Sequence, residues 1–150
     1  MSFIQNITGG AASYGVIYLT NSFTGIAFSY TTSYKEITGL AVSFNLGPTV
    51  QDFGMSTDGR LKYTGTDTKL FSVSSILGST GTSNVLSLQL YKNGSALTDS
   101  LVCGIESLRM SYYEVSLSTN DYISLFIKSQ SAFSGNIRIA MISACSINRV

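Results

Sequence analysis

The chain has 150 residues, of which 44% are hydrophobic and only 11% are charged, and its formal net charge is +1. This length suits one domain and is too short for two independent cores. The basic residues are spread from Lys35 to Arg149 without forming a cluster, which argues against direct binding of nucleic acid. So few charges are not enough to keep a fully exposed surface soluble. The composition therefore predicts an oligomer, in which part of the surface is covered.

Apolar and polar residues alternate with a period of two along the chain, between clusters of Gly, Asn, Asp and Ser. Sustained helical periodicity is absent from the sequence. We therefore expect an all-β protein with an N-terminal arm or loop at residues 1–13 and a single domain at residues 14–150. The expected strands, in chain order, are Gly15–Thr20, Gly25–Tyr30, Glu36–Asn45, Asp52–Met55, Leu61–Tyr63, Lys69–Leu77, Val85–Tyr91, Ala96–Val102, Met110–Ser118, Asp121–Lys128 and Asn136–Ser146.

The N-terminal part of the domain is rich in aromatic residues and carries no charge before Lys35. Two interpretations stay open for it. The aromatic side chains belong to a core strand, or a pair of strands lines an intersubunit contact beside the final strand, since aromatic residues are enriched at interfaces. The second interpretation places Tyr14, Tyr18 and Phe28 at the contact.

Two strands in the second half of the chain have a distinct inward face, and a turn follows the first of them. Asn93 and Gly94 both tolerate positive φ, which a tight hairpin turn requires. The inward residues of the two strands are Leu86, Leu88 and Leu90, and Ile123, Leu125 and Ile127.

The final strand, "NIRIAMISACSI", is apolar on both faces. Alternation puts Ile137, Ile139 and Met141 on one face and Ala140, Ile142 and Ala144 on the other. Such a strand lies in the middle of a sandwich or has its second face covered by another subunit, and we favour the subunit. The predicted oligomer interface therefore comprises Tyr14, Tyr18, Phe28, Ile137, Ile139, Ala140, Ile142 and Ala144.

The residues that usually carry catalysis are missing or scattered. The chain has no His, which excludes Ser-His and Cys-His nucleophiles and the commonest general base. The acidic residues occur singly rather than in pairs, so we expect neither an enzyme nor a cofactor. Asp58 and Asp67 lie in a turn-rich stretch, where a loop-bound calcium ion is the alternative to ordinary turn formation.

Cys103 and Cys145 are too few for a disulfide framework or a metal cluster. We interpret them as two buried thiols, with a bridge or an exposed pair as the alternatives. The N-terminus lacks a positive start followed by an apolar run, and no segment has the roughly 18 apolar residues that span a bilayer. We therefore expect no export signal and no membrane insertion.

Three motifs occur in a fixed order in the second half of the chain. Their residues are Gly59, Leu61, Tyr63, Gly65, Phe71 and Val73, then Tyr91 to Gly94, then Leu117, Asn120, Asp121, Ile123 and Leu125. From Gly59 to Ile147 the chain resembles the trimeric jelly roll of tumour necrosis factor and the complement globular heads. It is most similar to the related domains of phage and large DNA virus virion proteins.

The resemblance implies a two-sheet antiparallel jelly-roll sandwich with a threefold axis lined by the first and last strands. It also implies a role in recognition or assembly. Our first hypothesis is a viral structural protein of the virion, either a capsid component or a surface decoration or fibre head, which forms a homotrimer through its terminal strands. A pentamer fits the same composition. The hypothesis predicts that Ile142→Asp splits the oligomer and that Ser124→Asp does not.

The second hypothesis is a carbohydrate- or receptor-binding module. In this case exposed Tyr residues such as Tyr112 or Tyr113 would stack on sugars. The candidate partners are other copies of the chain, other virion proteins and a host-surface glycan or receptor.

Overall fold

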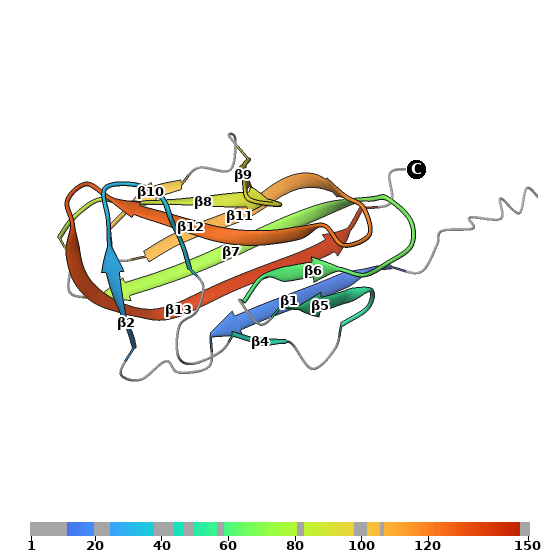
Figure 1. Ribbon diagram of the computed structural model, residues 1–150, viewed down its shortest axis with the longest axis horizontal. Helices are drawn as coiled ribbons and strands as arrows, with labels where there is room; N and C mark the ends of the chain where they lie inside the picture. The colour runs from blue at the N-terminus through green and yellow to red at the C-terminus, as the bar shows by residue number, and fades with distance from the viewer. Residues whose placement is uncertain are drawn as a thin grey trace, which may run out of the picture.

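The computed structural model describes residues 12–19, 25–37, 44–46, 50–56, 59–80, 83–97, 102–105 and 107–147, of which residues 44–46, 102 and 109–112 are described by their backbone alone. These residues form antiparallel strands and no helix, and the strands make two layers (Figure 1). The all-β expectation is confirmed. The division into an arm and a domain stays a prediction, because residues 1–11 lie outside the described part.

The first sheet contains the long strands that cross the whole molecule. Its middle strands are β7 (Lys69–Thr80), β13 (Phe133–Ser146) and β1 (Tyr14–Leu19), and β2 (Ile26–Tyr30) also pairs with β13. The first and last strands are direct antiparallel neighbours, with Tyr14 opposite Cys145. The strand order is β11 (Ser107–Leu117), β7, β13, β1 and β4 (Phe44–Leu46).

The second sheet lies over the first and is built from shorter strands (Figure 1). Its order is β10 (Val102–Gly104), β8 (Leu86–Lys92), β12 (Tyr122–Ser129), β6 (Leu61–Tyr63) and β5 (Phe53–Met55), with β3 (Lys35–Glu36) beside β12 and β9 (Ser95–Ala96) beside β8.

Two predicted strands are each divided in the structure. The strand predicted at Glu36–Asn45 is wrong, because β3 pairs in the second sheet and β4 pairs in the first. The strand predicted at Ala96–Val102 is also wrong. Its two ends both pair with β8, but the register shifts by three residues between the pair Tyr91↔Ala96 and the pair Leu88↔Val102.

The core lies between the two sheets and contains both predicted triplets. Leu86, Leu88, Leu90, Ile123, Leu125 and Ile127 are each at most 2% exposed. Each triplet contributes about 5–9 kcal/mol of burial before the entropy of ordering is subtracted. Three aromatic rings, those of Phe53, Tyr63 and Phe71, fill one end of the core with centroids 5.0–5.3 Å apart.

The predicted faces of β13 are wrong at its beginning, because the strand contains a bulge. Ile137 pairs with Ser79 and Ile139 with Gly78, which leaves Arg138 as an extra residue. An extra residue inverts the alternation beyond it. Ile137 therefore shares the core side with Ala140, Ile142 and Ala144, whereas Ile139 is 49% exposed on the outer side.

The second and third sequence motifs meet at one end of the molecule. The Asn93 amide donates to Asp121 (2.7 Å), and the Tyr122 main chain donates to Asn93 Oδ1 (2.9 Å). The backbone of Asn93 and of Asn120 has positive φ, 50° and 73°. The Asn93-Gly94 turn is thus fixed by contacts to the neighbouring loop as well as by its own geometry.

The first motif joins the same end. The Tyr63 main chain donates to Asp121 O (2.8 Å), and Tyr63 O accepts from the main chain of Asn120 (2.8 Å). A Cβ atom at Gly65 would overlap the Tyr63 ring, which is fully buried. The motifs that carry the resemblance therefore build the fold.

Candidate functional site

The outer side of the first sheet carries an apolar surface over its middle strands. Cross-strand pairing places Tyr18 beside Met141 and Met141 beside Ile76, with Val16 one row away. Tyr14 is 40% exposed at one end of this surface and Ile139 is exposed at the other. We name these residues the outer apolar face: Tyr14, Val16, Tyr18, Ile76, Ile139 and Met141.

Over three long stretches of these strands the remaining outward residues are uncharged as well, and the exposed Arg138 lies at the bulge just before one of them. Between Tyr14 and Tyr18, Ser72 and Gly78, and Ile139 and Cys145, the outward residues are apolar, Gly, Ser or Cys. The hydroxyls of Ser74 and Ser143 bond to each other at 2.6 Å, so they satisfy part of their own hydrogen bonding within the chain. An uncharged sheet face of this kind is typical of a contact surface.

The predicted interface residues divide between this face and the core. Tyr14, Tyr18 and Ile139 lie on the outer apolar face. The others lie inside the sandwich, where the second sheet of the same chain covers them: Phe28, Ile137, Ala140, Ile142 and Ala144. For these core residues a direct intersubunit contact is wrong, and the oligomer itself stays a prediction.

The outer side of the second sheet differs from the middle of the first sheet because it carries charge. Arg60 and Glu36 form a bidentate ion pair with N–O distances of 2.7 and 2.8 Å, and the Arg60 guanidinium lies over the Tyr122 ring. The rings of Tyr91 and Phe126 stack beside them with centroids 3.7 Å apart. This mixed surface is what a solvated sheet face usually presents.

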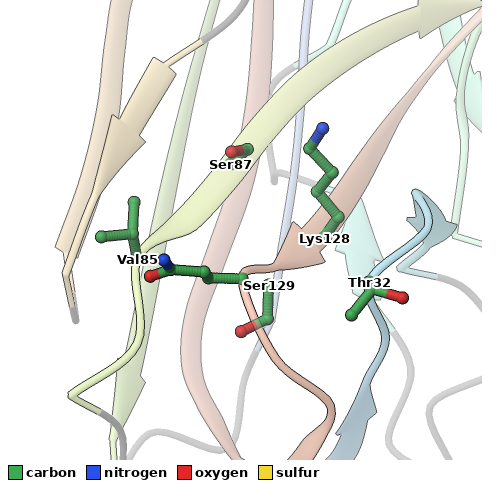
Figure 2. Close-up of a pocket in the computed structure, with 6 residues that line it drawn as sticks. Thr32, Val85, Ser87, Lys128 and Ser129 are labelled. Atoms are coloured by element: carbon green, nitrogen blue, oxygen red, sulfur yellow. The ribbon is translucent and has the colours of Figure 1, made fainter.

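A pocket of about 420 Å³ lies at one end of this second surface. Val85 and Thr32 lie on opposite sides of it, and Ser87 and Lys128 come from the adjacent strands β8 and β12 (Figure 2). Ser129 and Gln130 complete the lining. No sequence pattern predicted this pocket, because its residues come from three distant segments of the chain.

Hydrogen bonds join the three segments around the pocket. The Ser129 main chain donates to Thr31 O (2.8 Å), and the Gln130 main chain donates to Val85 O (3.0 Å). The Ser131 hydroxyl donates to the Asn84 side chain at 2.9 Å. The pocket is thus formed by the fold itself, before any ligand arrives.

Lys128 is the charged residue of the pocket. Its ammonium lies 4.7 Å from the centre of the Tyr34 ring, and no carboxylate in the described part of the chain pairs with it. Burial raises the pKa of the Tyr34 hydroxyl, with Cys103 and Tyr91 adding to the shift and a hydrogen bond with Ser87 opposing it. Tyr34 therefore stays neutral at physiological pH and leaves the positive charge of Lys128 uncompensated.

The other predicted groups lie apart from one another. Tyr113 packs partly against the core, and the side chain of Tyr112 lies outside what the structure describes. Cys103 and Cys145 are exposed and unbonded, so the interpretation as buried thiols is wrong. They lack the apolar cover that a buried thiol needs, because each strand presents them on its outer side.

The described residues give no support to the alternative of a loop-bound calcium ion. Asp67 is exposed, and Asp58 lies outside the described part. Within the ranges given above, no three His, Cys, Asp or Glu side chains come close enough together to hold a metal ion. The same ranges contain no helix long and apolar enough to cross a membrane.

Comparisons with known proteins place the fold. No protein-family model and no curated protein matches the chain. Among solved structures, the PRD1 vertex protein P5 is similar over 93% of this chain and 100% of its own, with 15% identity and a TM-score of 0.64. Murine APRIL is similar over 89% and 99%, with 11% identity and a TM-score of 0.55.

The chain is a TNF-like jelly roll. Eiger TNF from S. frugiperda is also similar to it, over 92% of this jelly roll and 95% of its own chain, with 9% identity and a TM-score of 0.52. At these identities the likeness concerns the fold, which the resemblance in the sequence had predicted. The function of this jelly roll has to be argued from its own surfaces.

Proposed function

We propose that this jelly roll is a structural protein of a virion, a capsid component or a surface decoration or fibre head, which self-assembles through its outer apolar face. The observation that carries the proposal is the absence of charge from the outward residues of β1, β7 and β13 between Tyr14 and Tyr18, Ser72 and Gly78, and Ile139 and Cys145. A second copy of the chain is the occupant, because the same face is present on every copy and is complementary in polarity to itself.

The contrast between the two outer surfaces of the sandwich supports assembly through the first sheet rather than the second. Charged residues occur on the outer side of the second sheet, including Arg60, Glu36, Lys62 and Lys128, whereas the middle of the first sheet has none. Packing the first sheets together removes the uncharged surface from water and leaves the charged surface outside. A trimer formed around β1 and β13 satisfies this requirement.

The likeness in fold to the vertex protein P5 of PRD1 supports the location in a virion. The likeness extends over the whole of that chain, so it is not confined to one sheet. The role proposed is structural rather than catalytic, because the chain has no His and the acidic residues that the structure describes form ion pairs or lie singly.

A second candidate function is recognition of a saccharide or a receptor. It is favoured by the pocket at Lys128, which lies on the second sheet and stays accessible when the first sheets are packed together. The two functions are compatible in one protein, since they use opposite surfaces.

Substitution of Met141 by Asp tests the assembly. We expect Met141→Asp to lower the association constant by at least about 100-fold, because each copy would bury an unpaired carboxylate in the contact. Analytical ultracentrifugation over a concentration series measures this change.

Lys62→Asp is the matched control, since it places a carboxylate on the outer side of the second sheet. It should assemble like the wild-type protein. If Met141→Asp assembles as well as Lys62→Asp, the outer apolar face is not the contact.

A further inference from the structure

We propose that the pocket at Lys128 binds a carboxylate-bearing sugar, such as a sialic or uronic acid. This inference goes beyond self-assembly, since it concerns another sheet and another kind of partner. Its basis is a preformed pocket in which one uncompensated cation lies among neutral hydrogen-bonding groups and one apolar side chain.

The charge of the pocket selects for an anionic ligand. Two described cations of this sheet are neutralised by carboxylates: Arg60 pairs with Glu36, and Lys92 pairs with Asp121 at 2.8 Å, whereas Lys35, Lys62 and Lys128 have no ion pair among the described residues. Lys128 instead has the face of the Tyr34 ring, 4.7 Å away, which orients the ammonium without neutralising it. A ligand carboxylate would supply the partner that the described residues do not.

The other lining residues suit a sugar rather than a simple anion. Thr32 and Ser87 offer hydroxyl groups and Gln130 offers an amide, and each can donate to or accept from a sugar hydroxyl. Val85 is 41% exposed and gives an apolar contact for the C–H face of a pyranose ring. A few placed polar groups beside an apolar contact are typical of small-molecule sites.

The size and the rigidity of the pocket fit a single sugar residue with room for part of a second. Its volume of about 420 Å³ lies near the lower end of the range for ligand pockets. The main-chain bonds from Ser129 to Thr31 and from Gln130 to Val85 hold its rim, so little ordering is required on binding.

Titration with monosaccharides, followed through the backbone amide NMR signals, tests the inference on the whole chain. We expect N-acetylneuraminic acid or glucuronic acid to bind weakly, with millimolar dissociation constants, and to shift the signals of Ser87, Lys128 and Gln130. Lys128→Gln should weaken this binding by at least about tenfold, whereas Lys128→Arg should retain part of it.

The control variant is Lys62→Gln, which removes another cation without an ion pair among the described residues of the same surface. It should bind like the wild-type protein. Glucose tests the need for the carboxylate and acetate tests the need for the sugar. Equal binding of glucose, equal binding of acetate, or binding that survives Lys128→Gln would each overturn the proposal.

The outcome is separable from that of the assembly experiment. A monomeric chain that binds the acidic sugar would sink the proposed assembly and keep this inference. A trimer without any shift at the pocket, at sugar concentrations well above the millimolar range, would do the reverse.

Discussion

Asp121 is the side chain that links the two loops at the motif end of the jelly roll. It accepts hydrogen bonds from the Asn93 amide (2.7 Å) and the Ser118 main chain (2.8 Å), and it pairs with Lys92 at 2.8 Å. Burial raises its pKa, but the hydrogen bonds from Lys92, Ser118 and Asn93 outweigh burial, so the pKa lies below its ordinary value.

Acid should therefore destabilise the protein through this residue. A carboxyl group whose folded-state pKa is lowered stabilises the fold above its unfolded-state pKa of about 3.9, and this contribution is lost as the pH falls through the folded value. We expect Asp121→Asn to lower the free energy of unfolding by about 1–2 kcal/mol at neutral pH. We also expect it to flatten the loss of stability below about pH 4.

Urea unfolding followed at several pH values measures both effects. Asp67→Asn is the control, because the Asp67 side chain is exposed and its main-chain carbonyl is what accepts from Tyr63. An Asp121→Asn variant with the stability and acid sensitivity of the Asp67→Asn variant would contradict this account.

The bulge in β13 is the element that decides which of its residues face the core and which face outward. In a regular strand, with Arg138 paired like its neighbours, Ile137 and Ile139 would lie on the same side of the sheet. With the bulge, Ile142 is 1% exposed and packs between the sheets. The experiment that the sequence suggested, Ile142→Asp as a test of assembly, would therefore unfold the protein instead.

The bulge itself can be tested with a pair of variants. Ile142→Asp should cost more than about 4 kcal/mol and abolish the folded state, because it buries an unpaired charge in place of an apolar side chain. Ile139→Asp should preserve the fold, since that side chain is half-exposed. Circular dichroism and limited proteolysis show which of the two variants is folded. If Ile139→Asp unfolds as Ile142→Asp does, Ile139 does not face outward and the bulge is not at Arg138.

Ser124→Asp, the control that the sequence suggested for the assembly experiment, is unsuitable as well. Ser124 lies opposite Tyr91 in the second sheet and is 1% exposed, and its hydroxyl has no hydrogen-bond partner among the described residues. An Asp at this position would be buried without a partner, so Lys62 replaces it as the site of the control.

At the level of elements, the alternation of apolar and polar residues predicted the inward faces of regular strands but not those of a strand with a bulge. The inward residues of β8 and β12 follow from a strict period of two, and both strands are regular over that stretch. The faces of β13 do not follow, because one extra residue changes the parity and leaves no mark on the composition. The split between β3 and β4 was missed because pairing with different sheets is a long-range choice.

At the level of the whole molecule, the two outer surfaces have different chemistry. The first sheet presents uncharged residues in the middle, and the second presents ion pairs, cations and a pocket. The low charge of the sequence predicted that a surface would be covered, and aromatic enrichment placed Tyr14 and Tyr18 in the predicted contact, which stays a prediction although both lie on the outer apolar face. The pocket had no such signal, since its residues lie near positions 32, 85 and 128 and meet only through the jelly-roll topology.

The mass of the wild-type protein in solution tests the central claim most directly. Size-exclusion chromatography with light scattering at micromolar concentration should give about three times the 16.1 kDa of the chain. A mass equal to that of one chain would contradict self-assembly through the outer apolar face.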